Sequence, residues 1–144
     1  MKLFTIGFTH KSAEVFFTAL KDAKVKRLID IRLKNRSQLS GFAKSPDLAY
    51  FLREIGGIDY EHWPEWAPTA AILDGYRKKR MDWPEYERRF RALMKERGIE
   101  RQVCAAELDH ACLLCSEALP AQCHRRLVAE YLQDAYPSMS LCHL

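Results

Sequence analysis

The sequence predicts a single-domain α/β fold over residues 1–144, with a mainly parallel central sheet flanked by helices in three layers. Short apolar runs alternate along the chain with segments in which apolar residues recur every three or four positions. This alternation is typical of a parallel sheet, because parallel strands need long, usually helical, crossovers. The length fits one domain, and no repeat, linker or low-complexity segment divides it.

The first part of the chain predicts two strands joined by a helix. The apolar run 2–7 ends in Gly7 and predicts the first strand. Ser12 is a candidate N-cap for a helix whose apolar stripe begins at Phe16. The run 25–31 predicts the second strand.

A polar and basic loop over residues 33–44 follows the second strand, and no period fits it. Ser45-Pro46 predicts a helix with proline at its first position, and Gly56-Gly57 predicts the end of that helix. Residues 58–63 predict a third strand, which would place Tyr60 beside a site at the strand ends.

Residues 64–82 are the least regular segment, with a short helical pattern over 70–79. Asp82-Trp83-Pro84 predicts the start of a longer helix, which Gly98 ends. Residues 99–108 fit either a short helix or a strand, and the spacing of their apolar residues favours the helix.

The last part of the chain predicts a strand, a loop and a helix. The apolar run 112–115 predicts a buried strand, and residues 116–120 interrupt it. Helical spacing follows as far as Pro137, and residues 139–144 predict a final short strand.

Composition and charge limit the class of protein. The apolar fraction of 48% and the charged fraction of 29% are ordinary for a globular domain, and no run approaches membrane-spanning length. The N-terminus predicts a strand rather than a signal peptide, so we expect a cytoplasmic protein with no membrane partner. A net charge of +4 is compatible with an anionic partner without requiring one, and the five cysteines are expected to be reduced.

Reactive and charged residues gather where two predicted strands end. Asp30 and Arg32 close the second strand and share a face by alternation. The junction after the run 112–115 carries a second group, namely Cys115, Glu117, Cys123, His124 and Arg125. Because ligands bind at the carboxyl ends of strands in open α/β sheets, we predict one site built from both groups.

One interpretation of this site is anion binding. Arg32 and either Arg125 or Arg126 would clamp a phosphate from two sides, beside the start of a helix, and Ser37 in the basic loop would add a contact. The alternative is structural: arginines that pair with Glu117 or Asp30 would only brace the loops.

A second interpretation is covalent catalysis. Cys123, at a helix N-terminus beside His124, has the surroundings that lower the pKa of a thiol. It would be the nucleophile, with His124 or His143 as base and Glu117 as an orienting or acid–base group, and Cys115 is an alternative nucleophile.

Other cysteine chemistry is less favoured. Cys104, Cys112 and Cys142 are expected to be buried and structural. The spacing argues against a metal site, because adjacent cysteine and histidine residues rarely bind one ion and no His-x-x-x-His pair exists, and no cofactor is predicted. A disulfide between Cys115 and Cys123 under oxidation requires that the two lie within bonding reach.

These residues resemble the uncharacterised family DUF488. The matching segments cover nearly the whole chain: Thr5-Ile-Gly7, Asp30-Ile-Arg32, Asn35-Arg-Ser37, Phe42, Leu113-Leu-Cys-Ser-Glu117, Cys123-His-Arg125 and His143. Many members carry Gly-His-Ser after the first strand, where this chain has Gly7-Phe-Thr-His10. The resemblance implies a compact α/β domain with a pocket at the strand ends, and it implies no reaction.

The leading hypothesis is a small enzyme that acts on a phosphate-bearing substrate, a nucleotide or a nucleic acid. One alternative is a non-catalytic nucleic-acid-binding module, which would use the loop 33–44 and the basic cluster 76–80. Another alternative is a thiol-based redox sensor. The sequence leaves the oligomeric state undetermined.

Overall fold

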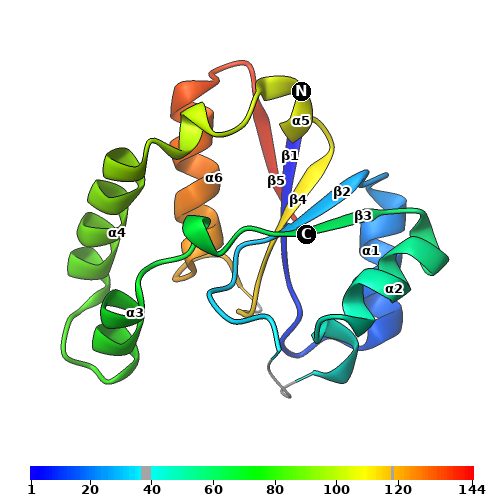
Figure 1. Ribbon diagram of the computed structural model, residues 1–144, viewed down its shortest axis with the longest axis horizontal. Helices are drawn as coiled ribbons and strands as arrows, with labels where there is room; N and C mark the ends of the chain where they lie inside the picture. The colour runs from blue at the N-terminus through cyan, green and yellow to red at the C-terminus, as the bar shows by residue number, and fades with distance from the viewer. Residues whose placement is uncertain (37–39, 118) are drawn as a thin grey trace.

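The computed structural model describes residues 1–36, 40–117 and 119–144 and confirms the predicted α/β class. Ser37, predicted to bind substrate, lies outside the described residues. Within the described residues, one parallel sheet has the order β3-β2-β4-β1-β5 (Figure 1). Its strands are β1 (Lys2–Gly7), β2 (Arg27–Asp30), β3 (Asp59–His62), β4 (Ala111–Cys115) and β5 (Ser140–His143).

Helices cover both faces of this sheet. They are α1 (Ala13–Asp22), α2 (Asp47–Gly56), α3 (Ala70–Arg77), α4 (Trp83–Arg97), α5 (Ala105–Leu108) and α6 (His124–Ala135), with 3-10 turns η1 (Gly41–Ala43), η2 (Pro64–Trp66) and η3 (Ile99–Arg101). α1 and α2 lie on one side of the sheet, and α3, α4 and α6 lie on the other (Figure 1).

Each face of the sheet has its own apolar core. On the side of α1 and α2, the core includes Phe4, Phe16, Leu20, Leu48, Leu52 and Leu114. On the side of α4 and α6, it includes Leu3, Ile29, Phe90, Leu113, Leu127 and Leu132. β4 is buried along its whole length because it lies between β1 and β2 and both faces are covered.

The strand register brings the predicted site to one edge of the sheet. Gly7 pairs with Cys115, and Asp30 pairs with Leu114, one residue before that cysteine. The ends of β1, β2 and β4 therefore meet, as expected for parallel strands that flank a ligand site.

Local chemistry explains the helix boundaries. The side chains of Ser12, Thr69 and Asp82 accept hydrogen bonds from backbone N–H groups in the first turns of α1, α3 and α4. Gly57 and Gly98 end α2 and α4 with φ values of 60° and 61°, a conformation that favours glycine. α2 begins at Asp47, one residue later than predicted.

The predicted helix over 99–108 is divided into η3 and α5. The hydroxyl of Tyr136 donates to the carbonyls of Glu100 and Val103, at 3.0 and 3.1 Å. These carbonyls are thus occupied by a tertiary contact, and α5 restarts with Cys104 as an extended cap residue.

The prediction that Cys104 and Cys142 are buried is wrong, whereas Cys112 is buried as expected. Cys104 lies at the exposed start of α5, and Cys142 lies on β5, an edge strand with mostly exposed residues. Across the described ranges, no helix is both long and apolar enough to cross a bilayer.

Candidate functional site

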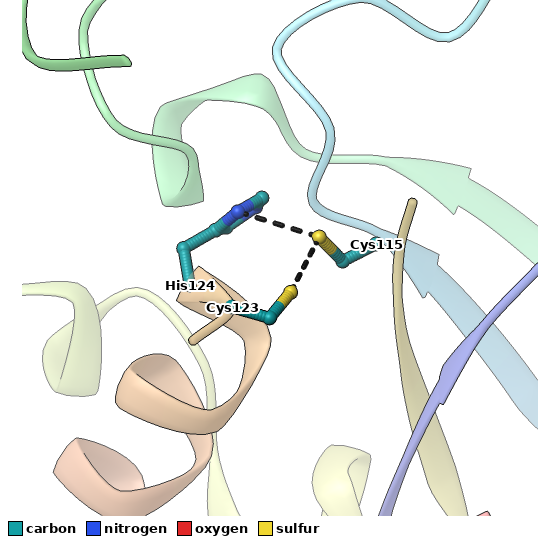
Figure 2. Close-up of side chains that lie close together, drawn as sticks. All are labelled: Cys115, Cys123 and His124. Atoms are coloured by element: carbon teal, nitrogen blue, oxygen red, sulfur yellow. Dashed lines mark hydrogen bonds between the residues drawn. The ribbon is translucent and has the colours of Figure 1, made fainter. Parts of the chain in front are cut away.

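Two thiols and an imidazole meet where β4 ends and α6 begins (Figure 2). The Sγ atom of Cys123 lies 2.7 Å from the Sγ atom of Cys115. The Nδ1 atom of His124 lies 3.4 Å from the same Cys115 sulfur. Cys115, Cys123 and His124 are 3%, 2% and 8% exposed, so the cluster is almost closed to solvent.

The local backbone explains why residues that are adjacent in sequence can share a partner. Cys115 is the last residue of β4, and Cys123 is the N-cap of α6 with extended dihedral angles, φ −134° and ψ 140°. His124 is the first helical residue. Neighbouring side chains within a helix point in different directions. Because the cap residue Cys123 is extended rather than helical, its side chain and that of His124 can both reach Cys115.

Contacts on the far side of the ring fix the orientation of His124. Its Nε2 atom donates to the carbonyl of Ile31, at 2.8 Å, and the ring of Phe90 packs edge-on at a centroid distance of 5.9 Å. With Nε2–H engaged by a carbonyl, Nδ1 is the nitrogen that faces Cys115.

Electrostatics favour a charged Cys115–His124 pair. Burial alone would raise the pKa of the Cys115 thiol, but the hydrogen bond from Cys123 and the charge of His124 hold that pKa well below its usual value. Burial likewise opposes the imidazolium, yet the facing Cys115 thiolate raises the pKa of His124. The pKa of Cys123 is raised by burial and by the Cys115 charge. These shifts favour the thiolate form at Cys115 over Cys123, in agreement with the hydrogen bond from the Cys123 Sγ atom to the Cys115 Sγ atom.

Gly7 allows the loop after β4 to pass close to β1. A Cβ atom at Gly7 would overlap the carbonyl of Glu117 and a guanidinium nitrogen of Arg125. Arg125 is 0% exposed and donates to that same carbonyl. Arg125 therefore braces the loop from inside, while Glu117 itself is exposed.

Asp30 and Arg32 form a bidentate ion pair with each other, at 2.8 and 2.7 Å. Arg32 also donates to the carbonyl of Ala43, and Tyr60 donates to Asp30 at 2.6 Å. Asp30 is 0% exposed and Arg32 is 3% exposed. The geometry matches the structural alternative for this pair.

The structure brings some of the predicted site residues together and separates others. Cys115, Cys123 and His124 form one cluster, and the hydrogen bond of His124 to Ile31 joins it to the end of β2. His143, the alternative base, instead contacts the hydroxyl of Thr5 at 2.6 Å.

Two contacts of the cluster of Cys115, Cys123 and His124 are not predicted by the sequence. Phe90 lies on the apolar stripe of its helix, a pattern that predicts only a core residue, and it also contacts the ring of His124. No sequence signal identifies the carbonyl of Ile31 as a hydrogen-bond acceptor, since every residue carries one.

The basic cluster 76–80 is placed on the surface. Arg77, Lys78, Lys79 and Arg80 are exposed, and the hydroxyl of Tyr76 donates to Gln122 at 3.0 Å. An apolar groove of about 310 Å³ lies between α1 and α2, and Phe17, Phe42 and Phe51 line it. No residue of the cysteine cluster lines that groove.

Comparisons with known proteins agree with the resemblance noted in the sequence. The family model described as "Domain of unknown function DUF488" matches residues 12–132. A search of curated proteins and a search of solved structures found no match. The matched segment spans most of the chain and includes β2, β4 and the cysteine cluster. This chain therefore belongs to the DUF488 family.

Proposed function

We propose that this protein is a thiol-based redox protein in which Cys115 and Cys123 interconvert between a dithiol and a disulfide. The observation that carries the proposal is the 2.7 Å separation of their sulfur atoms. A disulfide bond is about 2.05 Å long, so the two atoms need to move together by less than 1 Å to bond. His124, 3.4 Å from Cys115, completes the arrangement.

The oxidation requires an acceptor for two electrons, and a hydroperoxide supplies it. The Cys115 thiolate attacks one peroxide oxygen, the O–O bond breaks, and Cys115 becomes a sulfenic acid while the second oxygen leaves as hydroxide or water. The Cys123 sulfur then attacks the Cys115 sulfur, the disulfide forms, and water leaves. Cys115 is thus the attacking residue and Cys123 the resolving residue.

His124 keeps Cys115 reactive by taking its proton. An imidazolium held against a thiolate stabilises the nucleophilic form of the sulfur. Because the cluster is nearly closed to solvent, it favours small oxidants over bulky disulfides. This selectivity is expected of a sensor that reports peroxide and ignores larger thiol reagents.

Phosphate binding, the leading sequence-based hypothesis, remains a prediction with less support. The Nε and Nη2 atoms of Arg32 donate hydrogen bonds to the Asp30 carboxylate, and Nη2 also donates to the carbonyl of Ala43. Its Nη1 atom has no hydrogen-bond partner among the described residues, but it is buried. Arg125 is buried too, so neither arginine can meet a phosphate without opening the fold.

The test is to treat the reduced protein with limiting hydrogen peroxide and to count blocked thiols by alkylation and mass spectrometry. Wild type is expected to lose two of its five thiols to one intramolecular disulfide, mapped to Cys115 and Cys123. Cys123→Ser is expected to stop at a sulfenic acid on Cys115, which mass spectrometry detects as one added oxygen.

The matched control is Cys104→Ser, which removes an exposed thiol outside the cluster. It should leave the Cys115–Cys123 disulfide unchanged. Random oxidation of exposed thiols, with Cys115 and Cys123 still reduced, would refute the proposal.

A further inference from the structure

We propose that Cys115, Cys123 and His124 form a binding site for Zn²⁺ when both thiols are reduced. One ligand atom from each residue lies within 4.8 Å of the other two, and all three residues are buried. Thiolate sulfur and imidazole nitrogen are the ligand types that Zn²⁺ prefers in proteins.

The distances fit a zinc ion with a small adjustment. A tetrahedral ion with Zn–S bonds of about 2.3 Å and Zn–N bonds of about 2.0 Å separates its sulfur and nitrogen ligands by about 3.5 Å. The observed distance between Cys115 and His124 is 3.4 Å. The two sulfurs are 2.7 Å apart and must open to about 3.8 Å, which a rotation of the Cys123 side chain supplies.

The second contact of His124 is the one that zinc-binding histidines characteristically make. Metal-ligating imidazoles almost always donate their other ring N–H to a carbonyl or carboxylate, which fixes the tautomer and the ring orientation. Here Nε2 donates to the carbonyl of Ile31 at 2.8 Å, and Nδ1 faces the sulfur of Cys115. This observation is independent of the proximity of the three ligand atoms.

Three protein ligands leave one zinc position open. Within the described ranges, no fourth histidine, cysteine or acidic residue joins the group. A Cys₂His set with an open position is a known zinc coordination, in which water or a substrate atom takes the fourth place. The arrangement differs from closed structural sites, which have four protein ligands.

The spacing of Cys115, Cys123 and His124 in the sequence does not predict that they share one metal ion. Cys115 comes from the end of a strand, and Cys123 and His124 come from the start of a helix, so no short ligand repeat marks them. The extended backbone at Cys123 is what allows two neighbouring side chains to serve one ion.

Zinc binding would regulate the proposed dithiol, and in that respect this inference rests on the proposed function. As the two Zn–S bonds form, two protons leave the cluster in all. The metal then occupies the sulfur lone pairs that attack a peroxide, so oxidation and zinc occupancy exclude each other. Either property can fail alone.

The test uses the full chain, reduced and kept free of oxygen, with Zn²⁺ titrated against a chromophoric chelator. We expect one ion per chain with a dissociation constant below about 1 μM. Co²⁺ should give the visible absorption of a tetrahedral thiolate complex. His124→Gln is the sharpest variant, because its side-chain amide can still donate to Ile31 while the nitrogen facing the sulfurs is lost.

His124→Gln and Cys123→Ser are each expected to weaken zinc binding by more than about 100-fold. This loss exceeds the change of about 10–100-fold in metal affinity that follows when a residue that only supports a metal ligand is replaced. The double variant Cys104→Ser/Cys142→Ser, which lacks two exposed thiols, should bind as wild type does. Circular dichroism checks folding, and Cys123→Ser carries the test if His124→Gln does not fold.

Absence of one-to-one binding in the reduced protein, or equal binding by Cys123→Ser, would overturn the zinc site. Formation of the Cys115–Cys123 disulfide in His124→Gln, with zinc binding lost, would show that the two properties separate. Failure of the zinc-free wild type to form the disulfide, while the reduced protein still binds zinc, would leave the metal site standing and remove the redox proposal.

Discussion

Replacing Asp30 with alanine is expected to destabilise the protein strongly. The Asp30 carboxylate is 0% exposed and accepts from two nitrogens of the Arg32 guanidinium and from the hydroxyl of Tyr60. The substitution leaves a buried guanidinium without its counter-charge. Removing one partner of a buried ion pair typically costs about 3–5 kcal/mol, because the other charge stays buried and uncompensated.

That loss is large compared with a total stability of about 5–15 kcal/mol. With a urea slope of about 2 kcal/mol per molar, the unfolding midpoint should fall by about 2 M. The melting temperature should fall by about 6–20 °C for a chain of this size. Circular dichroism during urea and thermal unfolding measures both quantities.

Glu61→Gln is the matched control on the neighbouring strand. Arg27 and Glu61 also form an ion pair between β2 and β3, at 3.8 Å, but their side chains are 27% and 40% exposed. An exposed pair contributes about 0–1 kcal/mol, so this variant should unfold nearly as wild type does. Equal midpoints for the Asp30 and Glu61 variants would refute the bracing role of the buried pair.

Gly7→Ala should lower the free energy of unfolding in urea by about 1–3 kcal/mol, because the added Cβ atom overlaps the loop after β4. Gly41→Ala, whose added Cβ atom has no described atom within 4 Å, should leave this free energy nearly unchanged, and equal losses in the two variants would contradict the close packing at Gly7. Burial and the charge of Asp30 raise the pKa of Tyr60 to about 12, above the unfolded value of about 10. The protonated Tyr60 hydroxyl therefore stabilises the fold fully below a pH of about 10, and this contribution is lost as the pH rises through about 12. Tyr60→Phe should reduce the fall in unfolding free energy over this alkaline range, and an unchanged fall would contradict the prediction. A bulky aromatic disulfide should label Cys104 and Cys142 promptly and the three buried thiols only on unfolding; a third prompt thiol would disprove the burial.

Much of the fold could be predicted from the sequence because local chemistry and tertiary structure agree. Ser12 and Asp82 cap helices where they were expected, and Gly57 and Gly98 end them. The order of strands in the sheet could not be predicted, since it depends on which crossover passes over which strand.

The errors have tertiary causes. Tyr136 lies far along the chain from residues 99–108, yet its hydroxyl donates hydrogen bonds to two backbone carbonyls there, at the point where the expected helix is interrupted. Cys142 follows a strand pattern, but its strand is at an edge of the sheet, so the residue is exposed.

The grouping of the candidate-site residues was easier to predict than their individual contacts. Cys115, Cys123 and His124 meet in the structure, as expected for residues at the end of a strand and the start of the helix that follows it. The contacts of Cys123 and His124 could not be assigned, since neighbouring residues within a helix point in different directions and the sequence does not show that Cys123 is an extended cap residue. Arg32 satisfies Asp30 rather than facing outward, and alternation alone could not distinguish the two.

The strand order has a consequence for how the chain is made. β4 is inserted between β1 and β2, although both of those strands precede it by many residues (Figure 1). On the ribosome, β1 and β2 have no direct partner in each other, and β1 can join the β2–β3 pair only after the segment ending at Cys115 has emerged. A nascent chain halted before that point should remain sensitive to proteases, and the sulfur atoms of Cys115 and Cys123 become buried only late in synthesis.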